Sequence, residues 1–327
     1  MTEPCLLIGD IGGTNARFAL AYPDESGFFA ELTLSCADYE TAQQGIAAYL
    51  ERRGIERVDV ICLAVAGPVM DGSVNVINNH WEIDSSALKS KFGPSSVSLL
   101  NDFEAIAYSI PLLADTDIQT IGVVPSELAG KTEFTAAVMG PGTGLGIGGL
   151  LGRGGRLHPV SGEGGHVGFA PESPVQHKVL RQLRQEYERV SNERMLSGPG
   201  LENIYRALAA INEQPEADIT AAEIFSRVLA SEDMIAAEAT QLFFEALGQV
   251  AGNLVLTLGA YDGVFLAGGI LKRYPDLLKA SDFRAGFESK GRHRGLLESV
   301  PTSLILHPQP GLLGASHCAR ILLDQSG

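Results

Sequence analysis

Short apolar runs and segments of helical spacing alternate along the first third of the chain. Residues 41–54 place apolar side chains at helical spacing and stop at a glycine, and residues 103–113 have the same periodicity. Ser85 or Ser86 is expected to cap a further short helix that ends by Gly93. Strands are predicted from the apolar runs at residues 5–9, 16–22, 58–66 and 97–100. Because strands lead into helices through short loops, this part is expected to form an α/β sheet.

A second block with a similar beginning follows. The apolar run at residues 135–139 leads into the glycine-rich segment 140–152, which predicts strand, glycine turn and strand again. Helical pattern then dominates from about residue 173 to 260. The last predicted elements are short strands at 263–267 and 303–306 and a helix at 312–323. The repeated opening suggests a coarse duplication: two similar α/β domains, divided near residue 112, that face each other across a cleft.

Composition and charge exclude several classes of protein. The chain has 327 residues, of which 45% are hydrophobic, so it can bury a hydrophobic core without the help of covalent cross-links. The formal net charge is −15 and there is no basic cluster, which argues against a nucleic-acid partner or an anionic membrane surface. The four cysteines are widely scattered, as expected for free thiols in a reducing compartment. The amino-terminal segment has no basic region typical of a secretion signal, so we expect a cytoplasmic protein.

The first glycine turn lies in GDIGGTNARF and fits neither a Walker loop nor a Rossmann fingerprint. Glycines let main-chain N–H groups approach an anion closely, and Thr14 and Asn15 add side-chain donors. Asp10 would repel phosphate, so we expect it to hold Mg²⁺, through water. An ordinary β-hairpin turn with a capping aspartate is the alternative. The nucleotide-binding candidates of this turn are Gly9, Asp10, Ile11, Gly12, Gly13, Thr14 and Asn15.

The second glycine turn, GPGTGLG, contains a threonine that offers both its hydroxyl and its N–H group. Its nucleotide-binding candidates are Gly140, Gly142, Thr143 and Gly144. Two such turns, one in each half, favour a pair of loops that clamp the phosphates of one nucleotide, rather than two unrelated hairpins. Gly268 and Gly269 follow a predicted strand, where glycine lets a flat ring pack on the backbone; a plain strand-to-helix turn is an equal alternative.

Several polar residues are candidates for chemistry. Asp102, in LLNDFEA, is either a helix N-cap or a general base that accepts a hydroxyl proton during phosphoryl transfer. Glu163 and His166 lie in a glycine-rich loop, and together suit the hydroxyls of a polyol. A structural loop is the alternative there, and a zinc site would need further ligands. Glu193 alone would be interpreted as a solvated helix residue.

Taken together, these segments are similar to the motifs of bacterial glucokinases of the hexokinase superfamily, in the same order. The resemblance runs from Leu7 to the carboxyl terminus and rests on LIGDIGGTNARFAL, LNDFEA, GPGTGLGIG, PVSGEGGHVGF, NERMLSGPGL and FLAGGIL. It implies the two-domain actin-like, ribonuclease-H-like ATPase fold with an interdomain cleft. The small domain would be residues 1–112, to which a helix at about 307–327 returns, and the large domain 113–306. The implied reaction transfers the γ-phosphoryl group of ATP to the 6-hydroxyl of D-glucose, the first step of glycolysis.

The same resemblance implies roles for single residues. The two glycine turns would be phosphate loops, with Asp10 near Mg²⁺, and Asp102 would be the catalytic base. The residues implied to contact the sugar are Asn78, Asn101, Asp102, Glu163, His166 and Glu193. Asn78 lies in INNHW, where Ile77 departs from the TNxxW that the family more often shows. A homodimer is also implied.

Other functions on the same scaffold stay open. A kinase for fructose, mannose or an N-acetylated amino sugar would share these motifs, as would a sugar sensor without turnover or an actin-like filament. Sugar kinases of the repressor/ORF/kinase group carry clustered cysteines that bind zinc after the equivalent histidine, and residues 167–190 contain no cysteine.

Overall fold

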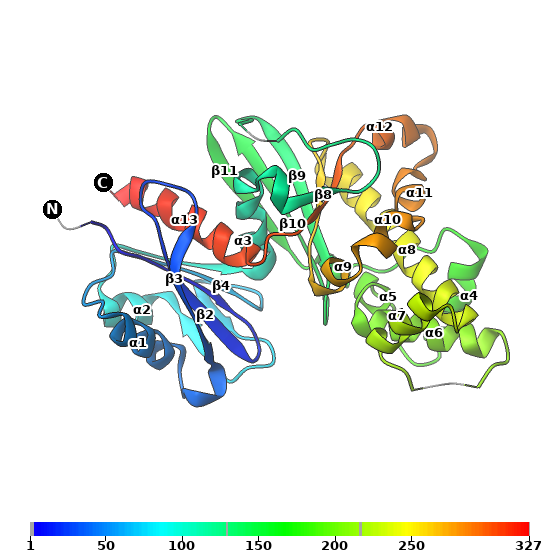
Figure 1. Ribbon diagram of the computed structural model, residues 1–327, viewed down its shortest axis with the longest axis horizontal. Coiled ribbons are helices and arrows are strands. Elements are labelled where there is room, and N and C mark those ends of the chain that lie inside the picture. Colours follow the sequence, from blue (N-terminus) through cyan, green and yellow to red (C-terminus); the bar gives the residue numbers. More distant parts are fainter. Residues whose placement is uncertain (1–2, 129, 216–217, 327) are drawn as a thin grey trace. The chain divides into compact units, whose positions relative to one another are not determined.

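The computed structural model describes residues 3–128, 130–215 and 218–326. The chain divides into two compact units, each built around its own sheet (Figure 1). Unit 1 takes the residues up to Ala114, Pro159–Ser161 and the residues from His307 onward. Unit 2 takes Asp115–His158 and Gly162–Leu306.

The sheet of unit 1 has five strands in the order β3-β2-β1-β4-β7. Strands β1, β2 and β3 are antiparallel neighbours, whereas β1, β4 and β7 run parallel. All six residues of β4 are buried, as expected for a parallel strand covered on both faces. The strands are β1 (Leu6–Ile11), β2 (Asn15–Ala21), β3 (Phe28–Ser35), β4 (Val60–Val65) and β7 (Ser96–Asn101), with a separate pair formed by β5 (Ser73–Asn75) and β6 (Glu82–Asp84).

Helices cover both faces of this sheet. The helices α3 (Asp102–Ser109) and α13 (Pro310–Ser326) pack together on one face, and α1 (Ala42–Arg53) and α2 (Ser85–Phe92) lie on the other (Figure 1). The carboxyl-terminal helix α13 contacts β1 and β4, so the end of the chain belongs to the same unit as its beginning.

Two local predictions for unit 1 were wrong in detail. The N-cap of α2 is Asp84, whose carboxylate accepts the Ala87 N–H at 2.8 Å, and not Ser85 or Ser86. Aspartate and serine are comparable acceptors for the free N–H groups of a first turn, so the contact of Ser73 with Asp84 decides between them, and the negative charge of Asp84 also suits the helix dipole. The helix predicted at residues 103–113 ends at Ser109 and continues as the short 3₁₀ segment η2 (Ile110–Leu112), because Pro111 lacks an N–H group.

Unit 2 contains a six-stranded sheet in the order β11-β10-β9-β12-β13-β8. Strands β9, β12 and β13 run parallel in its centre, and antiparallel strands flank them. The strands are β8 (Ile118–Thr120), β9 (Phe134–Pro141), β10 (Leu145–Arg153), β11 (Arg156–Gly162), β12 (Val264–Leu266) and β13 (Thr302–Ile305). Strand β9 is buried along its whole length, so the core of the unit lies on both sides of it.

A helical region packs against this sheet (Figure 1). Its centre is α8 (Met234–Leu258), which contacts α6, α7 and α11 and buries most of its apolar residues. The remaining helices are α4 (Pro174–Leu183), α5 (Asn192–Met195), α6 (Gly198–Ile211), α7 (Ala221–Ala230), α9 (Gly269–Arg273), α10 (Pro275–Ala280), α11 (Phe283–Glu288) and α12 (Arg294–Glu298). The other short 3₁₀ segments are η1 (Cys36–Asp38), η3 (Asp115–Asp117), η4 (Gly164–His166) and η5 (Gly291–His293).

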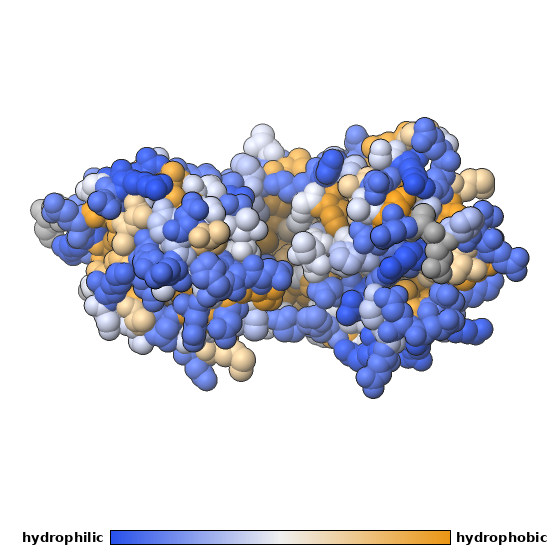
Figure 2. All heavy atoms as spheres, turned by 90° about the horizontal axis from the view of Figure 1, so that it is seen from below, coloured by the Kyte–Doolittle hydropathy of each residue, from blue (hydrophilic) through white to orange (hydrophobic). Residues whose placement is uncertain are grey.

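The predicted duplication of the opening motif is present in the structure. Strands β1 and β2 enclose the first glycine turn, and β9 and β10 enclose the second. In the part of the chain that the structure describes, no helix has the length and apolar character needed to cross a membrane. Figure 2 shows a face on which hydrophilic residues predominate and apolar residues are scattered, in keeping with the net charge of −15.

Candidate functional site

The first glycine turn is a tight connection between β1 and β2. Gly12 N–H donates to the Asn15 carbonyl at 3.0 Å, and the Thr14 carbonyl accepts the Cys36 N–H at 2.9 Å. Gly13 lies against the loop after β5, because a Cβ atom there would be 3.1 Å from the Cβ of Asn78. The turn is thus held by the backbone of Cys36 and by the loop after β5. It leads into a strand and not into a helix, as the sequence predicts.

Asp10 lies in β1, directly before this turn. Its Oδ2 is 3.5 Å from Nη1 of Arg17, and its side chain keeps 27% of its surface exposed. Burial raises the pKa of the Asp10 carboxyl, while the charge of Arg17 acts in the opposite direction. A partly exposed carboxylate beside a glycine turn suits Mg²⁺, which is held in proteins by one or two carboxylates together with water and substrate phosphates.

Asn78 and the first glycine turn line one hollow of 490 Å³ in unit 1. Asn78 has a positive φ of 58°, a left-handed conformation that asparagine tolerates better than most residues. The full lining is Gly13, Thr14, Cys36, Ala37, Asn78, Asn79 and His80. The hollow therefore joins predicted nucleotide-binding and predicted sugar-binding residues.

Asp102 is the first residue of α3, immediately after the parallel strand β7. The N-cap is Asn101, whose Oδ1 accepts the Phe103 N–H at 2.9 Å while Glu104 accepts the Asn101 N–H at 3.3 Å. This capping box takes over the role that the sequence left open for Asp102. Oδ1 of Asp102 also accepts the Phe103 N–H at 2.9 Å, and its side chain is partly exposed. The Asn101 amide donates to the Gly67 carbonyl at 3.1 Å, so the peptide before Asp102 is fixed.

In unit 2, Glu163 and His166 lie on the short segment around η4. Their Oε2 and Nε2 atoms are 3.9 Å apart, and both side chains are more than half exposed. The segment is tied to the start of α5, because the Asn192 N–H donates to the Val167 carbonyl at 2.8 Å and the Asn192 amide to the Gly164 carbonyl at 3.3 Å. Glu163 and His166 are therefore close to the residue before Glu193.

The second glycine turn connects β9 and β10. Gly142 N–H donates to the Gly144 carbonyl, and the Gly142 carbonyl accepts the Gly198 N–H, both at 2.8 Å. A Cβ atom at Gly140 would be 2.3 Å from the carbonyl oxygen of Ala267, so the turn lies directly on the end of β12, which precedes Gly268. A Cβ atom at Gly268 would in turn be 2.5 Å from the carbonyl oxygen of Pro141, so the two glycine segments of the second half lie side by side.

Glu193 joins the two parts of this site. Its Oε2 accepts the Leu145 N–H at 2.9 Å, which places the carboxylate on the second glycine turn. The interpretation of Glu193 as a solvated helix residue is therefore wrong. The contacts made by Arg17, Asn79 and Asn192 were missed from the sequence; Arg17 and Asn79 neighbour the candidate motifs, but spacing alone does not indicate their partners.

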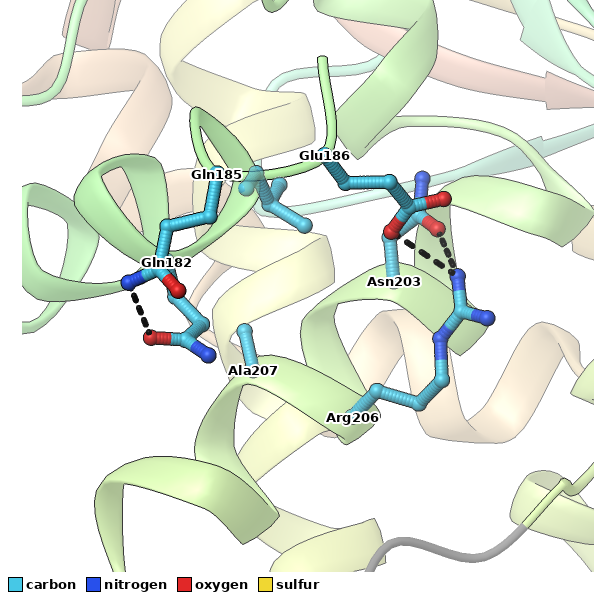
Figure 3. Close-up of a pocket in the computed structure, with 7 residues that line it drawn as sticks. Gln182, Gln185, Glu186, Asn203, Arg206 and Ala207 are labelled. Atoms are coloured by element: carbon cyan, nitrogen blue, oxygen red, sulfur yellow. Dashed lines mark hydrogen bonds and ion pairs between the residues drawn. The ribbon is translucent and has the colours of Figure 1, made fainter.

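A separate hollow of 340 Å³ lies between α4 and α6 (Figure 3). Figure 3 shows Arg206 reaching Glu186 and Asn203, and Gln182 paired with Gln185. No residue singled out from the sequence lines it. Asn203 donates to the Arg194 carbonyl at 3.0 Å, so the walls of this hollow support the helix that carries Glu193.

Comparison with known proteins identifies the family. The family model described as Glucokinase matches residues 7–322. The chain belongs to the glucokinase family. It is 42% identical over 310 residues to a glucokinase of Marinobacter nauticus, and the match covers 95% of each chain.

Solved structures agree with this membership. A glucokinase from an Antarctic psychrotroph is 33% identical, with a TM-score of 0.88 over 98% of this chain and 100% of that one. A glucokinase from Balamuthia mandrillaris, solved in complex with glucose, is 25% identical, with a TM-score of 0.75 over 97% of this chain and 94% of that one. The fold is the actin-like ATPase fold of sugar kinases, and the family resemblance inferred from the motifs is confirmed.

Proposed function

We propose that the protein transfers the γ-phosphoryl group of ATP to the 6-hydroxyl of D-glucose, giving glucose 6-phosphate. The observation that carries this proposal is the glucokinase-family match from residue 7 to residue 322, with 42% identity to a glucokinase over 95% of the chain. All the motifs that suit a sugar and a nucleotide lie within that match.

Asp102 would act as the general base. In the reaction the 6-oxygen forms a bond to the γ-phosphorus, the bond from that phosphorus to the β,γ-bridging oxygen breaks, and Asp102 takes the hydroxyl proton. The capping box of Asn101 and Glu104 supports this role, because it fixes the start of α3 without using Asp102 as the cap. ADP leaves with the bridging oxygen.

The two glycine turns would bind the phosphates through their N–H groups, with Thr14, Asn15 and Thr143 as further donors. Gly268 and Gly269 would pack against the nucleotide at the end of β12. Asp10 would hold Mg²⁺, which when bound offsets negative charge on the β- and γ-phosphates. The partial exposure of the Asp10 carboxylate supports this assignment.

The sugar hydroxyls would be bound by Asn78 and Asn101 from unit 1, and by Glu163, His166 and Glu193 from unit 2. The domain assignment made from the sequence is part of this proposal, because the proposed reaction requires loops of both units to act on one pair of substrates. Enclosure of the substrates would exclude water, a competing phosphoryl acceptor.

We also propose a cytoplasmic homodimer. The four cysteines are all free, which is usual in a reducing compartment. The dimer is inferred from the family resemblance alone.

A product assay tests the proposal. The purified protein is incubated with ATP and Mg²⁺ and with glucose, fructose, mannose or N-acetylated amino sugars, and sugar phosphates are identified by ³¹P NMR. We expect glucose 6-phosphate to form fastest, and turnover to stop on chelation of Mg²⁺ and return when it is restored. Faster phosphorylation of another sugar would favour the alternative kinase, and sugar binding without any product would favour a sensor.

A further inference from the structure

The contact between Glu193 and the second glycine turn connects two sets of residues to which the family resemblance gives different substrates. Glu193 is a predicted sugar ligand, whereas Gly144 is a predicted nucleotide ligand. Oε2 of Glu193 accepts the Leu145 N–H at 2.9 Å, a bond between residues 48 positions apart. A hydrogen bond to a charged acceptor is among the stronger ones in proteins, so it is expected to fix both partners.

Gly144 is required for this contact. A Cβ atom built on Gly144 would lie 2.5 Å from Oε2 of Glu193, well inside van der Waals contact. The absence of a side chain at residue 144 therefore gives the carboxylate the space in which it reaches Leu145. By contrast, a Cβ atom on Gly142, in the same turn, would meet nothing within 4 Å.

The main chain of Glu193 has little freedom to adjust. Its carbonyl accepts the Ser197 hydroxyl at 2.8 Å, and the next carbonyl, of Arg194, accepts the Asn203 amide at 3.0 Å. Asn203 is almost fully buried, so this support is rigid. A carboxylate displaced from the turn would have to swing away by side-chain rotation, because α5 cannot follow it.

We infer that Glu193 is shared between the two substrates: Oε2 holds the second glycine turn, and Oε1 takes a hydroxyl of the sugar. Gly144 and Glu193 are then positioning residues that couple sugar binding to the phosphate loop. This inference rests on the proposed function. Coupling of this kind is reciprocal, so glucose tightens the binding of the nucleotide by the same factor as the nucleotide tightens that of glucose.

The test compares substitutions within one turn. In Gly144→Ala the added methyl group displaces the carboxylate of Glu193. Although residue 144 lies in the nucleotide loop, we therefore expect the KM for glucose to rise about 10- to 100-fold, which is the range for a lost hydrogen bond to a charged group. Gly142→Ala is the matched control: we expect it to change the KM for ATP and to leave the KM for glucose as in the wild type. Measurements of kcat and KM use saturating concentrations of the other substrate, and thermal unfolding checks each variant.

Two substitutions of Glu193 test the coupling without changing the turn. Glu193→Gln keeps an oxygen acceptor for Leu145 N–H, so the KM for glucose should rise while the KM for ATP stays within about twofold. Glu193→Ala removes the acceptor, so both KM values should rise, and calorimetry should show that glucose no longer tightens the binding of a non-hydrolysable ATP analogue.

Two results would overturn the inference. One is a Gly144→Ala variant that folds and keeps the wild-type KM for glucose. The other is a Glu193→Ala variant whose KM for ATP matches that of Glu193→Gln, which decides the question even when Gly144→Ala does not fold. A wild-type protein that forms no glucose 6-phosphate would instead contradict the proposed function itself.

Discussion

At the scale of single residues, the geometry of the site depends on which groups cap the helices and which hydrogen bonds hold the candidate side chains. Asn101 caps α3, and this leaves Asp102 as the first residue of the helix, with its carboxylate partly exposed. In unit 2, Glu193 is drawn onto the second glycine turn by the Leu145 N–H. In both places a neighbouring residue or a backbone N–H group fixes the geometry of a candidate residue.

Asn79 has a comparable task in unit 1. Its amide nitrogen donates to the Gly12 carbonyl at 3.1 Å, and its Oδ1 accepts the N–H of Trp81 at 3.1 Å. Trp81 is almost completely buried and its indole N–H donates to the Tyr39 carbonyl, so it is a firm anchor. Asn79 thereby ties the first glycine turn to the core of the unit.

We therefore predict that Asn79→Ala raises the KM for ATP about 3- to 10-fold, since a neutral hydrogen bond contributes roughly 1 kcal/mol. Asn79→Asp keeps the acceptor for Trp81 N–H but loses the donor to Gly12, so its KM for ATP should rise at least as much. Steady-state kinetics at saturating glucose measure both. An unchanged KM for ATP in the two variants would show that this contact does not position the turn.

At the scale of elements, the strand–turn–strand units could be predicted from the sequence, whereas the helix caps and the contacts that fix them could not. Apolar runs on each side of a glycine cluster predict the hairpins β1–β2 and β9–β10, because period and turn chemistry are local properties of the sequence. The cap of α2 was assigned to the wrong residue, since Asp84, Ser85 and Ser86 are all good caps and tertiary contacts decide among them. Ser73, from the neighbouring strand β5, donates to Asp84 at 2.7 Å.

The cap of α2 gives a prediction of pH dependence. Hydrogen bonds from Ser86, Ser73 and the Ala87 N–H lower the pKa of Asp84 to about 2. A carboxyl whose pKa is lowered by folding stabilises the protein when ionised, so its contribution is complete above the unfolded pKa of about 3.9 and is lost as the pH falls towards 2. The Tm difference between wild type and Asp84→Asn, measured from pH 6 to pH 2, should be constant above about pH 5. It should shrink below pH 4, because the stabilising contribution of ionised Asp84 is lost there. A difference independent of pH would refute this assignment.

At the scale of the whole molecule, the order of the motifs predicted more than any single motif. Separately, GDIGGTNARF and GPGTGLG are also compatible with ordinary hairpins; together with LNDFEA and SGEGGHVGF they indicated the family, which the match over residues 7–322 confirms. The hydrogen bond that the Leu145 N–H donates to Glu193 could not be predicted, because it joins residues 48 positions apart and depends on how α5 and η4 pack. Likewise, nothing in the local sequence indicates that Asn79 reaches Gly12.

The most direct test of the account is the turnover of Asp102→Asn. Asparagine keeps the size of the side chain but cannot take up the hydroxyl proton at neutral pH, so kcat should fall by about 10²- to 10⁴-fold, the usual contribution of a general base. Glucose binding, measured by calorimetry on the same preparation, should be retained. Near-normal turnover in a variant that is folded and binds glucose would contradict the central claim that Asp102 accepts the proton.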